Sequence, residues 1–229
     1  MDIGSLAFNI STWVIPVLLA ITLHEASHGY VALRFGDDTA LRMGRVTFNP
    51  FKHIDPFGTV ILPIMLLVAS GGTMTFGFAK PVPVNFARLR PFRLGVGAVA
   101  FAGPGSNLIL AIASALLFHL VPSLPETVIP WARATLTVSM LINLILFFFN
   151  LIPIPPLDGG RILVAVLPEN LARPVARLER AGFVSILGAL FVLPWLGQQV
   201  GLDLDIFQWI VGRPAYETMI WIADFVGLD

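Results

Sequence analysis

The chain has 229 residues, of which 56% are hydrophobic and 12% are charged. A soluble domain usually has roughly 45–50% apolar and about 25% charged residues, so this chain has too few charges to cover the surface of a water-soluble globule. The net charge of +0 disfavours a nucleic-acid binder, and the lack of cysteine disfavours a disulfide framework. The composition therefore predicts a membrane protein with several spans, folded as a single domain over residues 1–229.

Several apolar segments are long enough to cross a hydrocarbon core of about 30 Å as helices. In chain order, the predicted spans cover residues 6–28, 94–121, 134–153 and 182–197. Residues 56–69 are also apolar, but they form a short run interrupted by proline, for which we expect a re-entrant element. Residues 206–226 contain charged side chains and either cross the membrane or lie in its interface. The sequence thus predicts an all-α polytopic membrane protein with about four to six transmembrane helices.

The basic residues indicate the orientation of these spans. All but two of the 14 lysines and arginines lie within residues 34–52, 80–93 and 161–180. Cytoplasmic loops of membrane proteins are rich in Lys and Arg, so these three segments are predicted to face the cytoplasm. Residues 119–132 and 198–206 contain neither type and are predicted to face outward.

The pattern changes over residues 41–49 and 73–85, where long helical runs are interrupted. In the second segment, Pro81 and Pro83 exclude a helix and would be tolerated only in an edge strand. Extended backbone at membrane depth must be buried in protein or line a wet cavity. This segment therefore indicates a functional site.

An H-E-x-x-H pattern begins at His24, near the inner end of the first span. Residues four apart lie on one face of a helix, so the imidazoles of His24 and His28 can bind the same metal ion. Glu25 lies about 100 degrees around the helix, within reach of a water on that metal. The pattern is typical of a zinc site with a glutamate as general base. The alternative is that both histidines are satisfied by neighbouring helices and that Glu25 is there by chance.

A catalytic zinc needs a third protein ligand and an open position for water. The metzincin pattern requires a glycine and a histidine where this chain has Val31 and Arg34. A thermolysin-like site requires a downstream glutamate, yet none occurs between Glu25 and Glu126. The architectures of soluble zinc proteases are therefore disfavoured.

Asp158 is the candidate for the missing ligand. It follows a proline-rich stretch at the cytoplasmic end of the predicted span 134–153, where a carboxylate could supply an oxygen ligand. The alternative is that Asp158 only caps the helix that follows it. Asp37 and Asp38 are rival ligands, but they lie in a predicted solvated loop.

Five motifs extend from the first span to the helix after Arg161. They cover residues 24–28, 44–50 with 53–56, 77–85, 103–107 and 150–159. In the content and order of these motifs, the chain resembles the site-2 protease family of intramembrane zinc metalloproteases, in its short form without PDZ or CBS domains. The departures are small: Phe78 stands where relatives often have Trp, and Gly105 where Leu is common.

The resemblance implies a role for each matching residue. His24, His28 and Asp158 correspond to the ligands of one zinc ion per chain. Glu25 corresponds to the base that activates water. Asn150 matches a position thought to steady the substrate or the developing oxyanion.

The resemblance also implies an architecture and an activity. It adds a small membrane-embedded β-sheet around residues 77–85 to the helical fold, with a catalytic core over about 6–165 and C-terminal helices over about 180–226. The implied activity is hydrolysis of peptide bonds within or near transmembrane segments of membrane-protein substrates, in regulated intramembrane proteolysis. The expected location is a prokaryotic plasma membrane, with the active site toward the cytoplasm.

Two non-enzymatic functions remain as alternatives: a catalytically silent membrane scaffold, and a metal-binding or transport bundle. A silent homologue would be expected to have lost Glu25 or a metal ligand, and all four residues are present. A transporter would be expected to distribute polar groups along a path through several spans. His53 lies in a predicted polar loop, where a solvated or structural role is expected.

Overall fold

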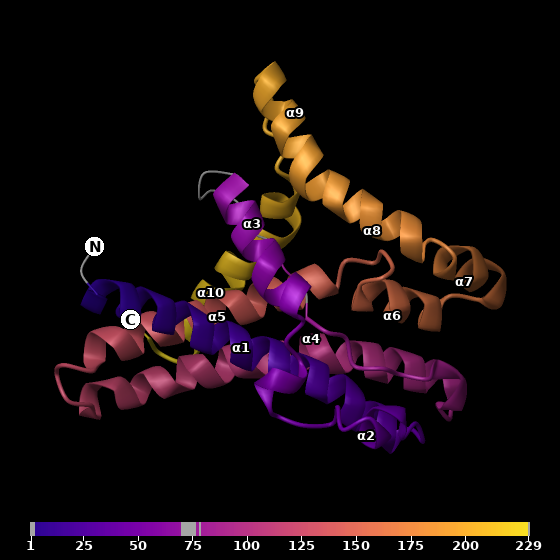
Figure 1. Ribbon diagram of the computed structural model, residues 1–229, viewed down its shortest axis with the longest axis horizontal. Coiled ribbons are helices and arrows are strands. Elements are labelled where there is room, and N and C mark those ends of the chain that lie inside the picture. The colour runs from indigo at the N-terminus through magenta and orange to yellow at the C-terminus, as the bar shows by residue number, and fades with distance from the viewer. Residues whose placement is uncertain (1–2, 70–76, 78, 229) are drawn as a thin grey trace.

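The computed structural model describes residues 3–69, 77 and 79–228, which are mostly helical (Figure 1). The α-helices are α1 (Ile3–Arg34), α2 (Thr39–Arg42), α3 (Leu62–Ala69), α4 (Phe92–Leu117), α5 (Ile129–Asn150), α6 (Asp158–Val166), α7 (Glu169–Ala176), α8 (Glu179–Leu187), α9 (Leu193–Val200) and α10 (Arg213–Phe225). Short 3₁₀ helices are η1 (Pro50–Lys52), η3 (Phe86–Arg88) and η4 (Phe118–Ser123), and π-helical turns are η2 (Pro56–Ile61), η5 (Gly188–Val192) and η6 (Gln208–Gly212).

Three helices of the described chain are long and apolar enough to cross a membrane. They cover Gly4–Arg34, Phe92–Ser123 and Ile129–Asn150, and they confirm the predicted spans 6–28, 94–121 and 134–153. The expected number of about four to six spans is therefore corrected to three among the described residues.

The fourth predicted span, 182–197, is not one of these three helices. The apolar helix described in this region covers Val184–Val200, which at 1.5 Å per residue is about 25 Å long and therefore shorter than a hydrocarbon core of about 30 Å. The apolar helix Pro56–Val68 is shorter still, as expected for a segment that does not cross independently.

The predicted membrane-embedded β-sheet is wrong for the described part of the chain, which contains no strand. Residues 79–85 have irregular backbone, and Pro81 and Pro83 provide no N–H group to a neighbouring strand. Residues 73–76 and 78, which were included in the predicted extended segment, lie outside the described residues.

The remaining N–H groups of this segment explain why it does not form a sheet. The main-chain N–H of Lys80 donates to the carbonyl of His53 (3.0 Å), that of Val82 to the carboxylate of Glu25 (2.7 Å), and that of Asn85 to the carboxylate of Asp37 (2.7 Å). These donors bind side chains and a loop carbonyl instead of another strand. Residues 79–85 are thereby tied to Glu25 in the H-E-x-x-H motif, to Asp37 beyond the end of α1 and to the loop at His53.

The core of the fold is the bundle of α1, α4 and α5, with α10 packed against α5 and α4 (Figure 1). One buried cluster joins α4, α5 and α10 through small and flexible apolar side chains, namely Ala111, Ala115, Met140, Leu144, Ala215 and Ile222. Small residues let the backbones of membrane helices approach closely. Within the bundle, α1 packs against both α4 and α5.

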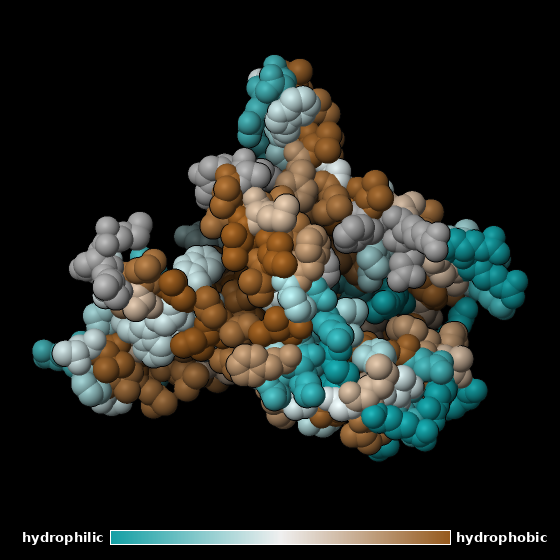
Figure 2. Space-filling model, in the orientation of Figure 1, coloured by the Kyte–Doolittle hydropathy of each residue, from teal (hydrophilic) through white to brown (hydrophobic). Residues whose placement is uncertain are grey.

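The outer surface of the molecule is apolar over much of its area. Figure 2 shows hydrophobic residues across the middle of one face and hydrophilic residues gathered near α2 and α7. Large apolar side chains such as Leu19 on α1 and Ile109 on α4 are more than half exposed. Such a surface is stable when lipid covers it, so the chain is an integral membrane protein.

Candidate metal centre

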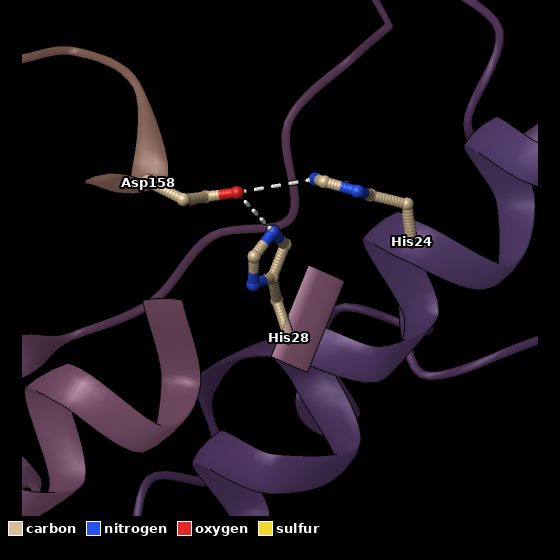
Figure 3. A group of neighbouring side chains, drawn as sticks. All are labelled: His24, His28 and Asp158. Atoms are coloured by element: carbon tan, nitrogen blue, oxygen red, sulfur yellow. Dashed lines mark ion pairs between the residues drawn. The ribbon is translucent and has the colours of Figure 1, made fainter. Parts of the chain in front are cut away.

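His24 and His28 project from α1 toward the first residue of α6 (Figure 3). The Oδ2 atom of Asp158 lies 3.3 Å from Nε2 of His24 and 3.4 Å from Nε2 of His28. All three side chains are buried. The helical spacing brings the two imidazoles together, and the packing of α6 against α4 brings the aspartate to them.

The loop between α5 and α6 explains how Asp158 reaches this position. The loop folds back tightly on the start of α6, so a Cβ atom on Gly159 would lie 2.2 Å from the carbonyl oxygen of Leu151, and one on Gly160 would lie 2.2 Å from the nitrogen of Pro155. Glycine is therefore required at both positions. The N-cap of α6 is Leu157, so Asp158 does not cap the helix as the alternative interpretation proposed.

Each histidine also has a partner at its other ring nitrogen. Nδ1 of His24 lies 2.6 Å from Oδ1 of Asn107, and Nδ1 of His28 lies 2.7 Å from the main-chain carbonyl of Val99. A carbonyl oxygen only accepts a hydrogen bond, so Nδ1 of a neutral His28 carries the proton and Nε2 presents a lone pair. Metal-binding histidines commonly have such a partner.

The three side chains fit a divalent metal. One ligand atom from each of His24, His28 and Asp158 lies within 4.8 Å of the other two. Oδ2 of Asp158 is buried and has no hydrogen-bond partner. A cation between these nitrogen and oxygen lone pairs would stabilise them. Two imidazoles with one carboxylate are a typical donor set for zinc.

Gly103 on α4 leaves room for this group. A Cβ atom at Gly103 would lie 2.5 Å from Nε2 of both His24 and His28, which is closer than a Cβ atom approaches a non-bonded neighbour. A Cβ atom at Gly105, on the same helix, would meet only the ring of Phe101 at 3.2 Å. Of these two glycines, Gly103 therefore faces the candidate metal centre.

Gly103→Ala is therefore expected to displace both imidazoles and to lower the zinc content below one ion per chain. Gly105→Ala is the matched control on the same helix and is expected to keep the wild-type zinc content, because the Phe101 ring can move. Zinc per chain is measured by atomic absorption on the purified proteins. Equal zinc contents in the two variants would contradict the position assigned to Gly103.

Glu25 lies beside this group. Its side chain is half-buried, and its Oε2 atom accepts the hydrogen bond from Val82 described above. Asn150, the last residue of α5, is also half-buried and donates from its amide nitrogen to the carbonyl of Leu146 at 2.9 Å. The structure thus places Glu25 next to His24, whereas the hydrogen bond of Asn150 stays within its own helix.

Several residues near the centre were missed by the sequence analysis. The guanidinium of Arg161 lies 3.9 Å from Oδ1 of Asp158, and its i,i+3 spacing from Asp158 could have indicated this pair. Asn107, a polar residue within a predicted span, contacts both His24 and Asn143. No local pattern links Asn143 to the site.

The rival carboxylates have structural roles. Asp37 is fully buried, in contrast to the solvated loop predicted for it, and accepts hydrogen bonds from Thr39 and from the N–H of Asn85. Burial raises the pKa of Asp37, but these hydrogen bonds outweigh it and hold that pKa below its ordinary value. Asp38 pairs with Arg42 and Arg88. His53 is likewise buried, and its Nε2 atom binds the carbonyl of Thr47.

Comparison with known proteins agrees with this geometry. The model of the family described as Peptidase family M50 matches residues 126–194. YwhC of Bacillus subtilis, provisionally named a zinc metalloprotease, is 42% identical over 191 residues, which are 82% of each chain. The chain belongs to peptidase family M50. This family is that of the site-2 proteases, so the resemblance found in the sequence is confirmed.

Other relatives extend the match of this M50 peptidase. Rip2 of Mycobacterium tuberculosis, also provisionally named a zinc metalloprotease, is 35% identical over 217 residues, which are 93% of this chain and 73% of that protein. The zinc metalloprotease RasP of Bacillus licheniformis is 24% identical over 162 residues, or 71% of this chain and 32% of RasP. No solved structure matches the chain. The chain is a zinc metalloprotease, and the non-enzymatic alternatives gain no support.

Proposed function

We propose that this M50 peptidase hydrolyses peptide bonds within or near the transmembrane segments of membrane proteins, with one zinc ion bound by His24, His28 and Asp158. The observation that supports the proposal best is the convergence of three buried ligand atoms, one of them without a hydrogen-bond partner. Two of the ligands lie on α1, and the third lies at the end of the loop that follows α5. The helices α1 and α5 are both candidate spans. A site next to two spans suits a substrate that is itself in the membrane.

Glu25 is the proposed general base. Zinc held by the three ligands supplies a Lewis acid for the scissile carbonyl and lowers the pKa of water to about 7. Glu25 takes the proton of the attacking water and passes it to the leaving amide nitrogen. The N–H of Val82 holds Oε2 of Glu25, which leaves Oε1 to accept the proton.

The residues around Val82 suit this positioning role. Pro81 and Pro83 have no N–H, so Val82 supplies the main-chain donor of the Pro-Val-Pro stretch. Proline also fixes φ, which restricts the backbone on both sides of the donor. The carbonyl of Lys80, just before this stretch, accepts a hydrogen bond from the buried Arg45 at 2.6 Å. These contacts hold Glu25 in one orientation beside His24.

Asn150 is the proposed donor to the developing oxyanion. Its amide nitrogen has two hydrogens, and the bond to Leu146 uses one of them. A positioned amide donor near the carbonyl under attack stabilises the charge that develops there. This role rests on the correspondence of Asn150 with the family motif and on its place at the end of α5.

The proposed partners are a transmembrane protein or peptide substrate and the lipid bilayer. We place the catalytic centre toward the cytoplasmic side of a prokaryotic plasma membrane. The basic segments 34–52, 80–93 and 161–180 support this orientation because they include the C-terminal end of α1, the N-terminal end of α4 and Arg161, which lies one turn after Asp158 in α6. The bacterial origin of the relatives supports the choice of membrane.

The proposal is tested by reconstituting the full chain in lipid vesicles with a membrane-anchored reporter. We expect cleavage within or near the reporter's transmembrane segment, mapped by mass spectrometry. Removal of zinc with a chelator is expected to stop cleavage, and added zinc is expected to restore it. Cleavage that persists without zinc, or that occurs only far from the membrane, would contradict the proposal.

A further inference from the structure

Two asparagine side chains are buried between the apolar helices behind the metal centre. Asn107 on α4 and Asn143 on α5 are 0% and 1% exposed. Nδ2 of Asn107 donates to Oδ1 of Asn143 at 2.8 Å, and Nδ2 of Asn143 donates to the carbonyl of Ser139 at 2.8 Å. Oδ1 of Asn107 faces Nδ1 of His24 at 2.6 Å. Polar groups are costly at membrane depth, so a buried amide pair behind a metal ligand calls for a physical reason.

The direction of these hydrogen bonds is fixed by main-chain carbonyls, which only accept. The carbonyl of Ser139 requires the amide nitrogen of Asn143 on its side, so Oδ1 of Asn143 points to Asn107. Nδ2 of Asn107 then faces Asn143, and it also lies 3.3 Å from the carbonyl of Ala20. Both acceptors set the same orientation of Asn107.

The consequence for His24 is a single tautomer. Oδ1 of Asn107 accepts only, so Nδ1 of His24 carries the hydrogen and Nε2 presents its lone pair toward Asp158. For His28, the carbonyl of Val99 has the same effect directly. The protein thus uses one main-chain carbonyl for His28 and, for His24, a chain of two amides that starts at Ser139 on α5.

We propose that Asn107 and Asn143 are positioning residues that fix the tautomer of His24 and thereby present Nε2 to the metal. This inference rests on the metal site of the proposed function. Asn107 acts as the hydrogen-bond acceptor for His24, and Asn143 acts by orienting the amide of Asn107. The partner of a metal-binding histidine commonly contributes 10- to 100-fold to metal affinity.

The test is the zinc affinity of the full chain in detergent, measured by competition with a chromophoric chelator. Asn107→Leu is expected to lower the affinity roughly 10- to 100-fold because no acceptor remains for Nδ1 of His24. Asn107→Asp keeps an oxygen acceptor at the same place and is expected to restore most of the affinity. Asn143→Leu is expected to cause a smaller loss, since the carbonyl of Ala20 still orients Asn107.

Ser114→Ala is the matched control. It removes a hydrogen bond between the side chains of Ser114 on α4 and Ser139 on α5. The main-chain carbonyl of Ser139, which orients Asn143, stays in place, so this variant is expected to keep wild-type affinity. Wild-type affinity in Asn107→Leu, or an equal loss in Asn107→Leu and Asn107→Asp, would overturn the inference. If Asn107→Leu does not fold, wild-type affinity in Asn143→Leu overturns it. The wild-type chain is measured alongside. If it binds zinc and cleaves the reporter, the proposed function holds, and an unexpected affinity in the variants counts only against the roles of Asn107 and Asn143.

Discussion

Glu25→Gln is expected to reduce proteolysis strongly while the zinc content stays at one ion per chain. Glutamine has the shape of glutamate, and its Oε1 atom can still accept the hydrogen bond from Val82, but its amide cannot take a proton from water. General acid–base catalysis typically contributes 10²- to 10⁴-fold, so we expect kcat to fall by roughly that factor. The measurements are the rate of reporter cleavage in vesicles and zinc per chain.

Glu126→Gln is the matched control for this substitution. Glu126 is exposed and lies outside the metal centre, in the segment between α4 and α5, so the same change in charge is expected to leave the cleavage rate unaltered. A Glu25→Gln protein that cleaves the reporter at the wild-type rate would contradict the role of general base. Loss of zinc together with loss of activity would instead assign Glu25 to the metal site.

Asp158→Asn is expected to remove zinc and, with it, all cleavage. The substitution preserves size, but it replaces the one negatively charged ligand with a neutral amide whose N–H groups can donate to Nε2 of His24 or His28. The metal-free state then gains hydrogen bonds in place of the metal. We expect the zinc affinity to fall by more than the roughly 10- to 100-fold that follows from the loss of a ligand's hydrogen-bond partner.

Asp38→Asn controls for the removal of a carboxylate. Asp38 pairs with Arg42 and Arg88 and is absent from the group of possible metal ligands, so this variant is expected to retain zinc. The zinc affinities of both variants are compared by titration in competition with a chromophoric chelator. An Asp158→Asn chain that binds zinc as tightly as the wild type would assign the third ligand to another residue.

The parts of this site that follow from local periodicity could be predicted from the sequence. His24 and His28 share a helix face because they are four residues apart within a long apolar helix. Asp158 was chosen by elimination and by its motif, and the structure places it beside them. The metal-binding role of Asp158 and the catalytic role of Glu25 remain predictions that the experiments above test, and the role of Asn150 also remains a prediction.

The errors concern contacts between segments far apart in the chain. A proline-rich alternating segment predicts an edge strand, but the N–H groups of Val82 and Asn85 bind carboxylates that lie 57 and 48 residues away. Asp37 follows a helix end and was therefore placed in solvated loop, although it is buried as the acceptor for Asn85. Such partners depend on how the loops pack on α1, which sequence periodicity does not specify.

More spans were predicted than the described residues contain. Hydropathy identifies residues 182–197 as apolar, but a span also requires length, and the described apolar helix Val184–Val200 is shorter than each of the three candidate spans. The contact between Asn107 and Asn143 likewise depends on the packing of α4 against α5. A polar residue within an apolar run indicates that a partner exists without indicating which one.

The most direct test of the metal centre is X-ray absorption at the zinc edge on the wild-type chain in lipid. The chain contains four histidines, of which His24 and His28 lie in the proposed site and His53 and His119 lie outside it. We expect a first coordination sphere of two imidazole nitrogens with oxygen ligands, unchanged in a His119→Gln variant. A spectrum with fewer than two imidazoles, or one that loses an imidazole in that variant, would contradict a zinc ion held by His24, His28 and Asp158.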